Sequence, residues 1–168
     1  MMSVPKLPLG DWIEGLEAWL ETNADPFFQG VKWTIGGIVS GLEQCFTFLP
    51  APIVIVIFSL LAYAIGRLRI ALFTLIGLGL IWNLGYWDGT MQTLALVLTS
   101  AIISIVAGIP TGILCARSNR LQNVVTPVLD FMQTMPAFVY LLPAVAFFSL
   151  GVVPGVIASV IFAIPPTI

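Results

Sequence analysis

The chain has 168 residues, of which 59% are hydrophobic and only 8% are charged, and its mean hydropathy is +1.07. A soluble domain usually carries about 25% charged residues, so this composition excludes an ordinary soluble globular protein and predicts an integral membrane protein. The net charge of −2 provides no basic surface for nucleic acid.

The sequence lacks the residues that most enzyme and metal sites need. It contains no histidine, and its two cysteines, Cys45 and Cys115, form no CxxC pair. We therefore expect no metal site, no bound cofactor and no Ser/His/Asp triad. No GxxxxGK[ST] motif occurs, so the chain does not bind ATP through a P-loop. These observations predict a protein that is not an enzyme.

Residues 1–49 are expected to form an external, amphipathic helical segment. Apolar residues recur at helical spacing over 11–21 and again over 28–46, with polar residues on the opposite side. The sequence NADP at 23–26 interrupts the pattern and predicts a break between two helices. Such helices are typical of elements that lie in the membrane interface. The acidic first helix also fits packing on a protein partner, or a collar that only steadies the bundle.

Residues 50–168 are expected to form an all-α transmembrane bundle of about five spans. A span needs about 20 mostly apolar residues. The candidate spans are approximately 50–66, 70–86, 93–116, 135–150 and 156–168. The last of these is too short to be complete. We therefore expect the sequence to be a fragment that stops before a cytoplasmic loop, with a re-entrant tail as the alternative.

Basic residues set the expected orientation, because Lys and Arg concentrate in cytoplasmic loops. Two arginines join the first two spans and two follow the third, whereas the loop at 86–90 has none. The N-terminal segment, that loop and the turn at 151–155 are then external. The residues placed on the cytoplasmic side are Arg67, Arg69, Arg117 and Arg120.

Small residues occupy every fourth position along part of the third span. Small side chains at this spacing let another helix approach closely within a membrane. Pro110 lies among them and should kink the helix. We interpret the column as a helix-packing face in preference to a ligand site. Its members are Ser100, Ser104, Gly108 and Gly112.

Polar residues and prolines gather over 130–145, DFMQTMPAFVYLLPAV, between two apolar stretches. The dipeptide Met135–Pro136 predicts a break, since the residue before a proline avoids the helical conformation. We expect a short helix at the inner surface before the break and a span kinked at Pro143 after it. Polar groups at membrane depth usually face a bundle interior or a wet cavity. The stretch is therefore a candidate wall of a passage or a subunit contact.

Three stretches resemble permease subunits of the glycine betaine/proline ABC importers: DFMQTMPAFVYLLPAV, GVVPGVIASVIFAIPPTI and GIPTGILCARSNRLQNVVTPVLD. The resemblance covers about residues 50–168 and is specific over 106–168. It implies a multi-pass permease subunit in a bacterial plasma membrane, which forms the path for quaternary ammonium osmoprotectants such as glycine betaine, proline betaine or choline. The implied partners are ATP-binding cassette ATPase subunits, an extracytoplasmic solute-binding protein, a second permease copy and membrane lipid.

The resemblance also implies that an ATPase-coupling loop with an EAA-type motif would follow PPTI at 165–168. A quaternary ammonium group has no donor on its nitrogen, but aromatic faces attract it by about 0.5–2 kcal/mol each through cation–π contact. The alternative is that the aromatic residues only pack. The candidates for the translocation path are Phe131, Gln133, Thr134, Met135, Pro136, Phe138 and Tyr140.

Two other functions remain open on the sequence. One is an ion-coupled carrier or channel subunit. Such proteins usually need ionisable groups within the membrane, and the predicted spans contain none away from their ends. The other is a non-transporting membrane scaffold, for which the column of small residues alone would suffice.

Overall fold

The structure is a computed structural model that describes residues 9–168. This part of the chain is all-α, as predicted, and contains no strand. Between its first and last turns, a helix pairs its backbone N–H and C=O groups internally, which suits so apolar a sequence to lipid. In chain order the elements are α1 (Leu9–Thr47), α2 (Ala51–Asn83), α3 (Trp87–Arg117), α4 (Asn119–Thr134), α5 (Ala137–Phe148), α6 (Val152–Ala163) and the 3-10 helix η1 (Pro165–Thr167).

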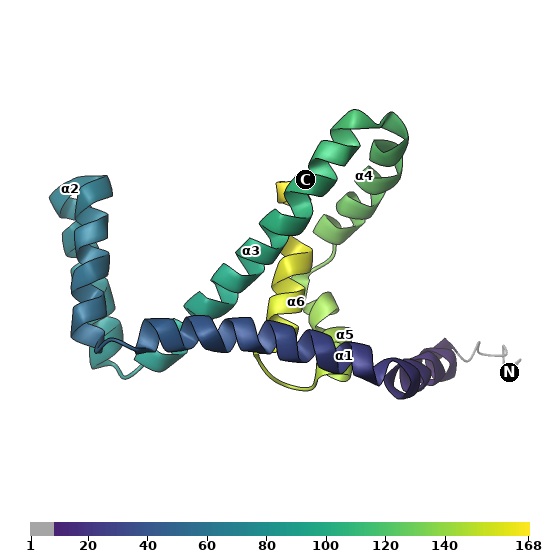
Figure 1. Cartoon of the computed structure of the whole chain (residues 1–168), viewed down its shortest axis with the longest axis horizontal. Helices are drawn as coiled ribbons and strands as arrows, with labels where there is room; N and C mark the ends of the chain where they lie inside the picture. The colour runs from purple at the N-terminus through teal and green to yellow at the C-terminus, as the bar shows by residue number, and fades with distance from the viewer. Residues whose placement is uncertain (1–8) are drawn as a thin grey trace, which may run out of the picture.

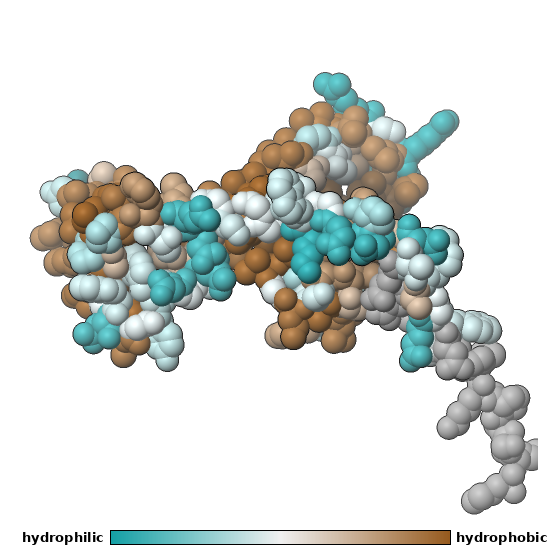
Figure 2. Space-filling model, turned by 60° about the horizontal axis from the view of Figure 1, so that its bottom comes forward, coloured by the Kyte–Doolittle hydropathy of each residue, from teal (hydrophilic) through white to brown (hydrophobic). Residues whose placement is uncertain are grey.

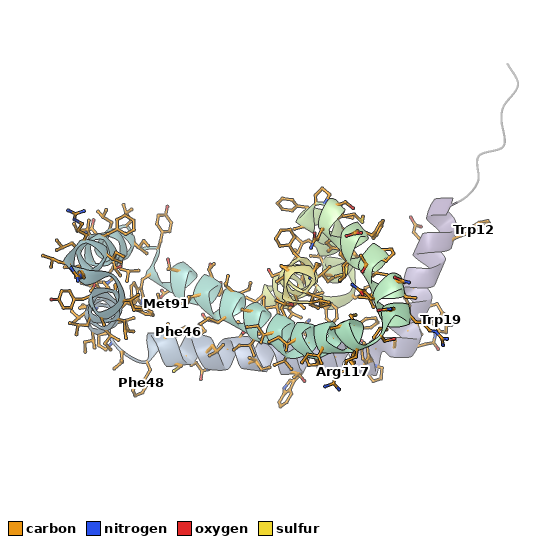
Figure 3. The ribbon with its side chains drawn as sticks, turned by 90° about the horizontal axis from the view of Figure 1, so that it is seen from above. Trp12, Trp19, Phe46, Phe48, Met91 and Arg117 are labelled. Carbon is orange, nitrogen blue, oxygen red and sulfur yellow. The ribbon has the colours of Figure 1, made fainter. Side chains whose placement is uncertain are left out.

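Residues 9–47 of the N-terminal segment form one helix of 39 residues, so the predicted break at 23–26 is wrong. Pro26 lies inside α1 and cannot donate to the carbonyl of Thr22, which bends a helix without ending it. In Figure 3 the end of α1 that carries Trp12 and Trp19 turns away from the rest of the helix. The two predicted amphipathic stretches are therefore arms of a single bent helix.

Helix α2 contains a break at Arg67, whose backbone has φ 60° and ψ −167°. The break falls between the first two predicted spans, and the two arms of α2 lie side by side in Figure 3. Gly66 permits the break, because a Cβ at that position would collide with the side chain of Ile70. The second arm ends at Asn83, and Gly85 at φ 79° turns the chain towards α3.

The predicted external loop at 86–90 is largely helical. Helix α3 begins at Trp87, and the N–H and hydroxyl of Thr90 both donate to the carbonyl of Tyr86. The turn is therefore shorter than expected and centres on Gly85. Pro110 lies within α3, which continues to Arg117.

Helices α4 and α5 meet at a bend of 94°, which lies at the predicted break between Met135 and Pro136. Figure 1 shows α4 returning beside the end of α3. The expected short helix at the inner surface is thus a helix that runs antiparallel to α3. Pro127 and Pro143 lie inside α4 and α5 respectively, and each helix continues through its proline.

Helix α6 begins at Val152, four residues before the predicted start at 156. Pro154 lies in its first turn, where the missing N–H has no helical partner to lose. The turn between α5 and α6 is consequently Ser149–Gly151 instead of the predicted 151–155. Ser149 and Gly151 both have positive φ, at 63° and 157°.

Length separates the helices into two groups. Within residues 9–168, α2 and α3 are long and apolar enough to cross a membrane, and the bent pair α4–α5 counts as a third candidate. Helices α5 and α6 have 12 residues each, about 18 Å at 1.5 Å per residue, whereas the hydrocarbon core is about 30 Å thick. The predicted fourth and fifth spans are therefore not complete single-helix spans in this structure.

The packed centre lies where α1 crosses α3 and α6 (Figure 1), around the fully buried Val39, Ala95 and Val156. Helix α2 stands to one side and is joined to the rest by a second cluster, in which Met91 packs near Phe46 (Figure 3). Figure 2 shows a hydrophilic stripe along α1 between apolar surfaces. Such surfaces require lipid or other protein chains around them.

Candidate functional site

The candidate site is the bend between α4 and α5, which two residues form. Met135 (φ −86°, ψ 136°) and Pro136 (φ −59°, ψ 140°) are both extended, so the helix stops and restarts in another direction. Pro136 favours this geometry because its ring disfavours the helical conformation at the residue before it. A backbone that leaves the helical path exposes carbonyl groups that need partners.

Two side-chain hydroxyls occupy carbonyls that the end of α4 leaves free. The hydroxyl of Thr134 donates to the carbonyl of Phe131 over 3.0 Å. The hydroxyl of Tyr140 donates to the carbonyl of Met132 over 2.9 Å. In a continuous helix the N–H of residue 136 would bond to that second carbonyl, but a proline has no N–H. Tyr140 thus supplies the donor that Pro136 lacks.

The other path candidates lie on the surface of the chain. Phe131 is 62% and Phe138 78% exposed, and Gln133 is also exposed. The bend therefore brings together the hydroxyls of Thr134 and Tyr140 with backbone carbonyls, and it leaves the amide and the two aromatic rings without protein around them. An amide, free ring faces and a bent backbone can make weak contacts to a passing solute.

The column of small residues on α3 lies against α6 and η1. Ser100 Oγ is 3.5 Å from the carbonyl oxygen of Val156, and Thr167 Oγ1 donates to the Ser104 carbonyl over 3.2 Å. A Cβ on Gly108 would collide with Thr167, and one on Gly112 would collide with the backbone of Ile168. The Ser104 hydroxyl is the one buried side-chain polar atom without a partner in the described part of the chain.

The four arginines all lie at one end of the molecule. The break in α2 and the junction between α3 and α4 are at the end away from α1 (Figure 1), and Arg117 closes α3 (Figure 3). The side of a membrane that this end faces stays a prediction. Among the side chains that the structure describes, no group of three His, Cys, Asp or Glu residues is placed to hold a metal ion.

A hollow of about 240 Å³ lies at the other end of α5, against α1. Its walls include Asp25 and Lys32 from α1 and Phe147 and Ser149 from the end of α5. A carboxylate, an ammonium group and an aromatic ring therefore share one small space. Because α5 runs from the bend to this hollow, the angle of the bend also sets the position of one wall of the hollow.

Sequence reasoning missed the backbone partners at the bend. It assigned Thr134 and Tyr140 to a passage, and it gave no role to Met132 or to the aromatic residues that join α1 to α5. The sequence does contain a signal for the bond between Tyr140 and Met132. Tyr140 lies four residues after Pro136, which lies four residues after Met132. The ring of Phe28 on α1 stacks on the ring of Phe147 on α5. No comparable local signal identifies this pair, because the two residues are far apart in the sequence.

Comparison with known proteins places the bend inside a shared domain. Residues 108–168 match the family described as binding-protein-dependent transport system inner membrane component. This range contains the end of α3 and all of α4, α5, α6 and η1. The candidate site is thus within the matched part of the chain.

Curated relatives match nearly the whole chain. The sequence is 52% identical over all its residues to the glycine betaine transport system permease protein OpuAB of Bacillus subtilis, and 47% identical over the whole chain to the glycine betaine/carnitine transport permease protein GbuB of Listeria monocytogenes. It is 45% identical over 96% of the chain to the glycine betaine/proline betaine transport system permease protein ProW of Escherichia coli.

The chain spans about 60% of the length of the Bacillus and Listeria proteins and 46% of the Escherichia protein. Residues 108–168 therefore resemble the family of binding-protein-dependent transport system inner membrane components, and nearly the whole chain is similar to these permease proteins.

Proposed function

We propose that the chain is part of the permease subunit of an ATP-driven importer of quaternary ammonium osmoprotectants, such as glycine betaine, proline betaine or choline. The observation that carries this proposal is the 52% identity, over every residue of the chain, to a glycine betaine transport system permease protein. Relatives named for glycine betaine, carnitine and proline betaine support a solute with a quaternary ammonium group.

The proposed partners follow from the family. ATPase subunits act on the cytoplasmic side, and a solute-binding protein delivers the solute from outside. A second permease copy and lipid cover the apolar faces of α2 and α3, many of whose large side chains are exposed in the single chain. Residues 1–49 form an external segment in this arrangement, and residues 50–168 form the transmembrane part.

The proposed path passes the bend between α4 and α5. Phe131, Gln133 and Phe138 are exposed there in the single chain, which supports their contact with solute or with a second copy. A permease needs weak contacts that release the solute, and one or two aromatic faces at about 0.5–2 kcal/mol each supply them. Tight recognition is then left to the solute-binding protein.

Uptake in cells tests this proposal. The gene product that contains this sequence is expressed with its ATPase and solute-binding protein in cells that lack other betaine uptake systems. Labelled glycine betaine should accumulate under salt stress only when all three components are present. Uptake that persists without the ATPase would support an ion-coupled carrier or channel, and a complete system that moves no quaternary ammonium solute would overturn the proposal.

A further inference from the structure

Helices α4 and α5 are joined by a short connection of two extended residues. Only Met135 and Pro136 separate them, and α4 buries none of its residues. Among the described residues, the bond from Tyr140 to the Met132 carbonyl is the one side-chain hydrogen bond between the two helices. The bond is therefore the direct side-chain link across the 94° bend, while α5 also packs on α6 and α1 and α4 packs on α3.

The bond is possible because of two features of the sequence. Pro136 removes the amide that would have used the Met132 carbonyl, and Tyr140 lies one turn into α5, from which its hydroxyl reaches back across the bend. The Tyr140 side chain is half-buried, so competition from water is reduced. A free carbonyl in a membrane costs several kcal/mol, which favours keeping the bond.

We propose that Tyr140 is a positioning residue, whose hydroxyl holds α5 at the angle that transport requires. This inference rests on the proposed function and differs from a role in which the ring of Tyr140 attracts the solute. Thr134 has the supporting role, since its hydroxyl occupies the neighbouring Phe131 carbonyl and steadies the last turn of α4. The bend then presents Gln133 and Phe131 to the path in a fixed direction.

Two substitutions at one position separate the two roles. Tyr140→Phe removes the hydroxyl and keeps the ring, whereas Tyr140→Leu removes both. If the hydroxyl positions α5, both variants should lower the maximal rate of glycine betaine uptake about three- to tenfold, as expected for the loss of one hydrogen bond. The concentration for half-maximal uptake should not change, because the solute-binding protein sets it. Rates are normalised to the amount of permease in the membrane.

Matched controls come from the same chain. Tyr63→Phe makes the same chemical change on α2, where Tyr63 is 56% exposed, and should leave the rate unchanged. Thr134→Val removes the hydroxyl at the end of α4 and should also lower the rate. A wild-type rate for Tyr140→Phe beside an impaired Tyr140→Leu would overturn the proposal in favour of the ring.

A distance measurement tests, without any transport assay, whether the Tyr140 hydroxyl holds the angle between α4 and α5. Spin labels are attached at Val124→Cys and Leu142→Cys, two exposed positions on α4 and α5, after Cys45 and Cys115 have been replaced by serine. Labelled protein is diluted with unlabelled protein, so that distances within one chain are measured. The distance distribution should widen in Tyr140→Phe and stay narrow in Tyr63→Phe. An unchanged distance distribution in Tyr140→Phe would overturn the positioning role of Tyr140. A wild-type permease that transports no betaine would overturn only the proposed function.

Discussion

The rings of Phe28 and Phe147 stack with their centroids 4.8 Å apart and their planes 7° from parallel. Phe148 adds an edge-to-face contact to the same ring of Phe28 at 5.5 Å. These contacts fasten the bent N-terminal helix to the end of α5, the helix that leaves the candidate site. The segment before the first span is therefore attached to the part of the fold that carries the proposed path.

We expect Phe28→Ala to destabilise the protein by about 1–3 kcal/mol, because it removes a half-buried aromatic side chain and its stacking contact with Phe147. Thermal unfolding in detergent measures the effect as a lower Tm. Phe48→Ala is the matched control, since Phe48 is 85% exposed and takes part in none of the ring contacts found in the described part of the chain. Equal losses in the two variants would show that the contact with Phe147 adds nothing.

Gly108 permits the close approach of Thr167 to α3, so Gly108→Ala should destabilise the fold by about 1–3 kcal/mol through overpacking. Gly89 lies in the same helix and has open space around it. Gly89→Ala should be neutral or slightly stabilising, since alanine favours a helix over glycine by up to about 1 kcal/mol. The Tm of each variant, measured by thermal unfolding in detergent, gives the comparison. A Gly108→Ala protein with the Tm of the wild type would contradict the packing described for this face.

Because of the break in α2, we expect substitutions at two neighbouring residues to change the stability of the protein in opposite directions. Arg67 has a backbone conformation that strongly favours glycine, so Arg67→Gly should stabilise the protein by about 1–3 kcal/mol. Gly66→Ala should destabilise it, because the new Cβ would collide with Ile70. Thermal unfolding in detergent measures both changes. Effects of the same sign would indicate that α2 is not broken at this point.

The sequence was sufficient to locate some of these features and not others. Two arginines in an apolar run identified the break in α2, and the Met135–Pro136 dipeptide identified the bend, because both signals are local. Pro26, Pro127 and Pro154 show the limit of such signals, since a proline can bend a helix, lie within it or occupy its first turn. Neighbouring helices decide among these outcomes.

The contents of the site were also only partly predictable. The polar and aromatic residues of the bend were evident from their types, but the direction of the Tyr140 hydroxyl depends on the angle between two helices. That angle brings the hydroxyl to the Met132 carbonyl. Likewise, the spacing of small residues on α3 predicted a close approach, but it did not identify η1 as part of the surface that approaches.

Gln133 is the path candidate that offers an exposed amide at the bend. We expect Gln133→Leu to lower the maximal rate of betaine uptake about three- to tenfold, since it removes a hydrogen-bonding group from the proposed path. Gln122→Leu is the control, because it makes the same change on an exposed position near the start of α4. If Gln133, Thr134 and Tyr140 can all be replaced by apolar residues without loss of uptake, this segment acts as a scaffold.

The orientation predicted from the four arginines can be measured in intact cells. After Cys45 and Cys115 have been replaced by serine, Asn23→Cys should react with a membrane-impermeant thiol reagent, since Asn23 is exposed and expected outside. Arg69→Cys should react only after the cells are made permeable. The reverse pattern would invert the proposed topology.

The most direct test of the central claim is solute accumulation in proteoliposomes. The gene product that contains this sequence is reconstituted with its ATPase subunits, and its solute-binding protein and labelled glycine betaine are supplied on the external side. Accumulation should require ATP on the ATPase side and the solute-binding protein, and ion gradients alone should not replace ATP. Accumulation driven by a sodium or proton gradient without ATP would contradict the account.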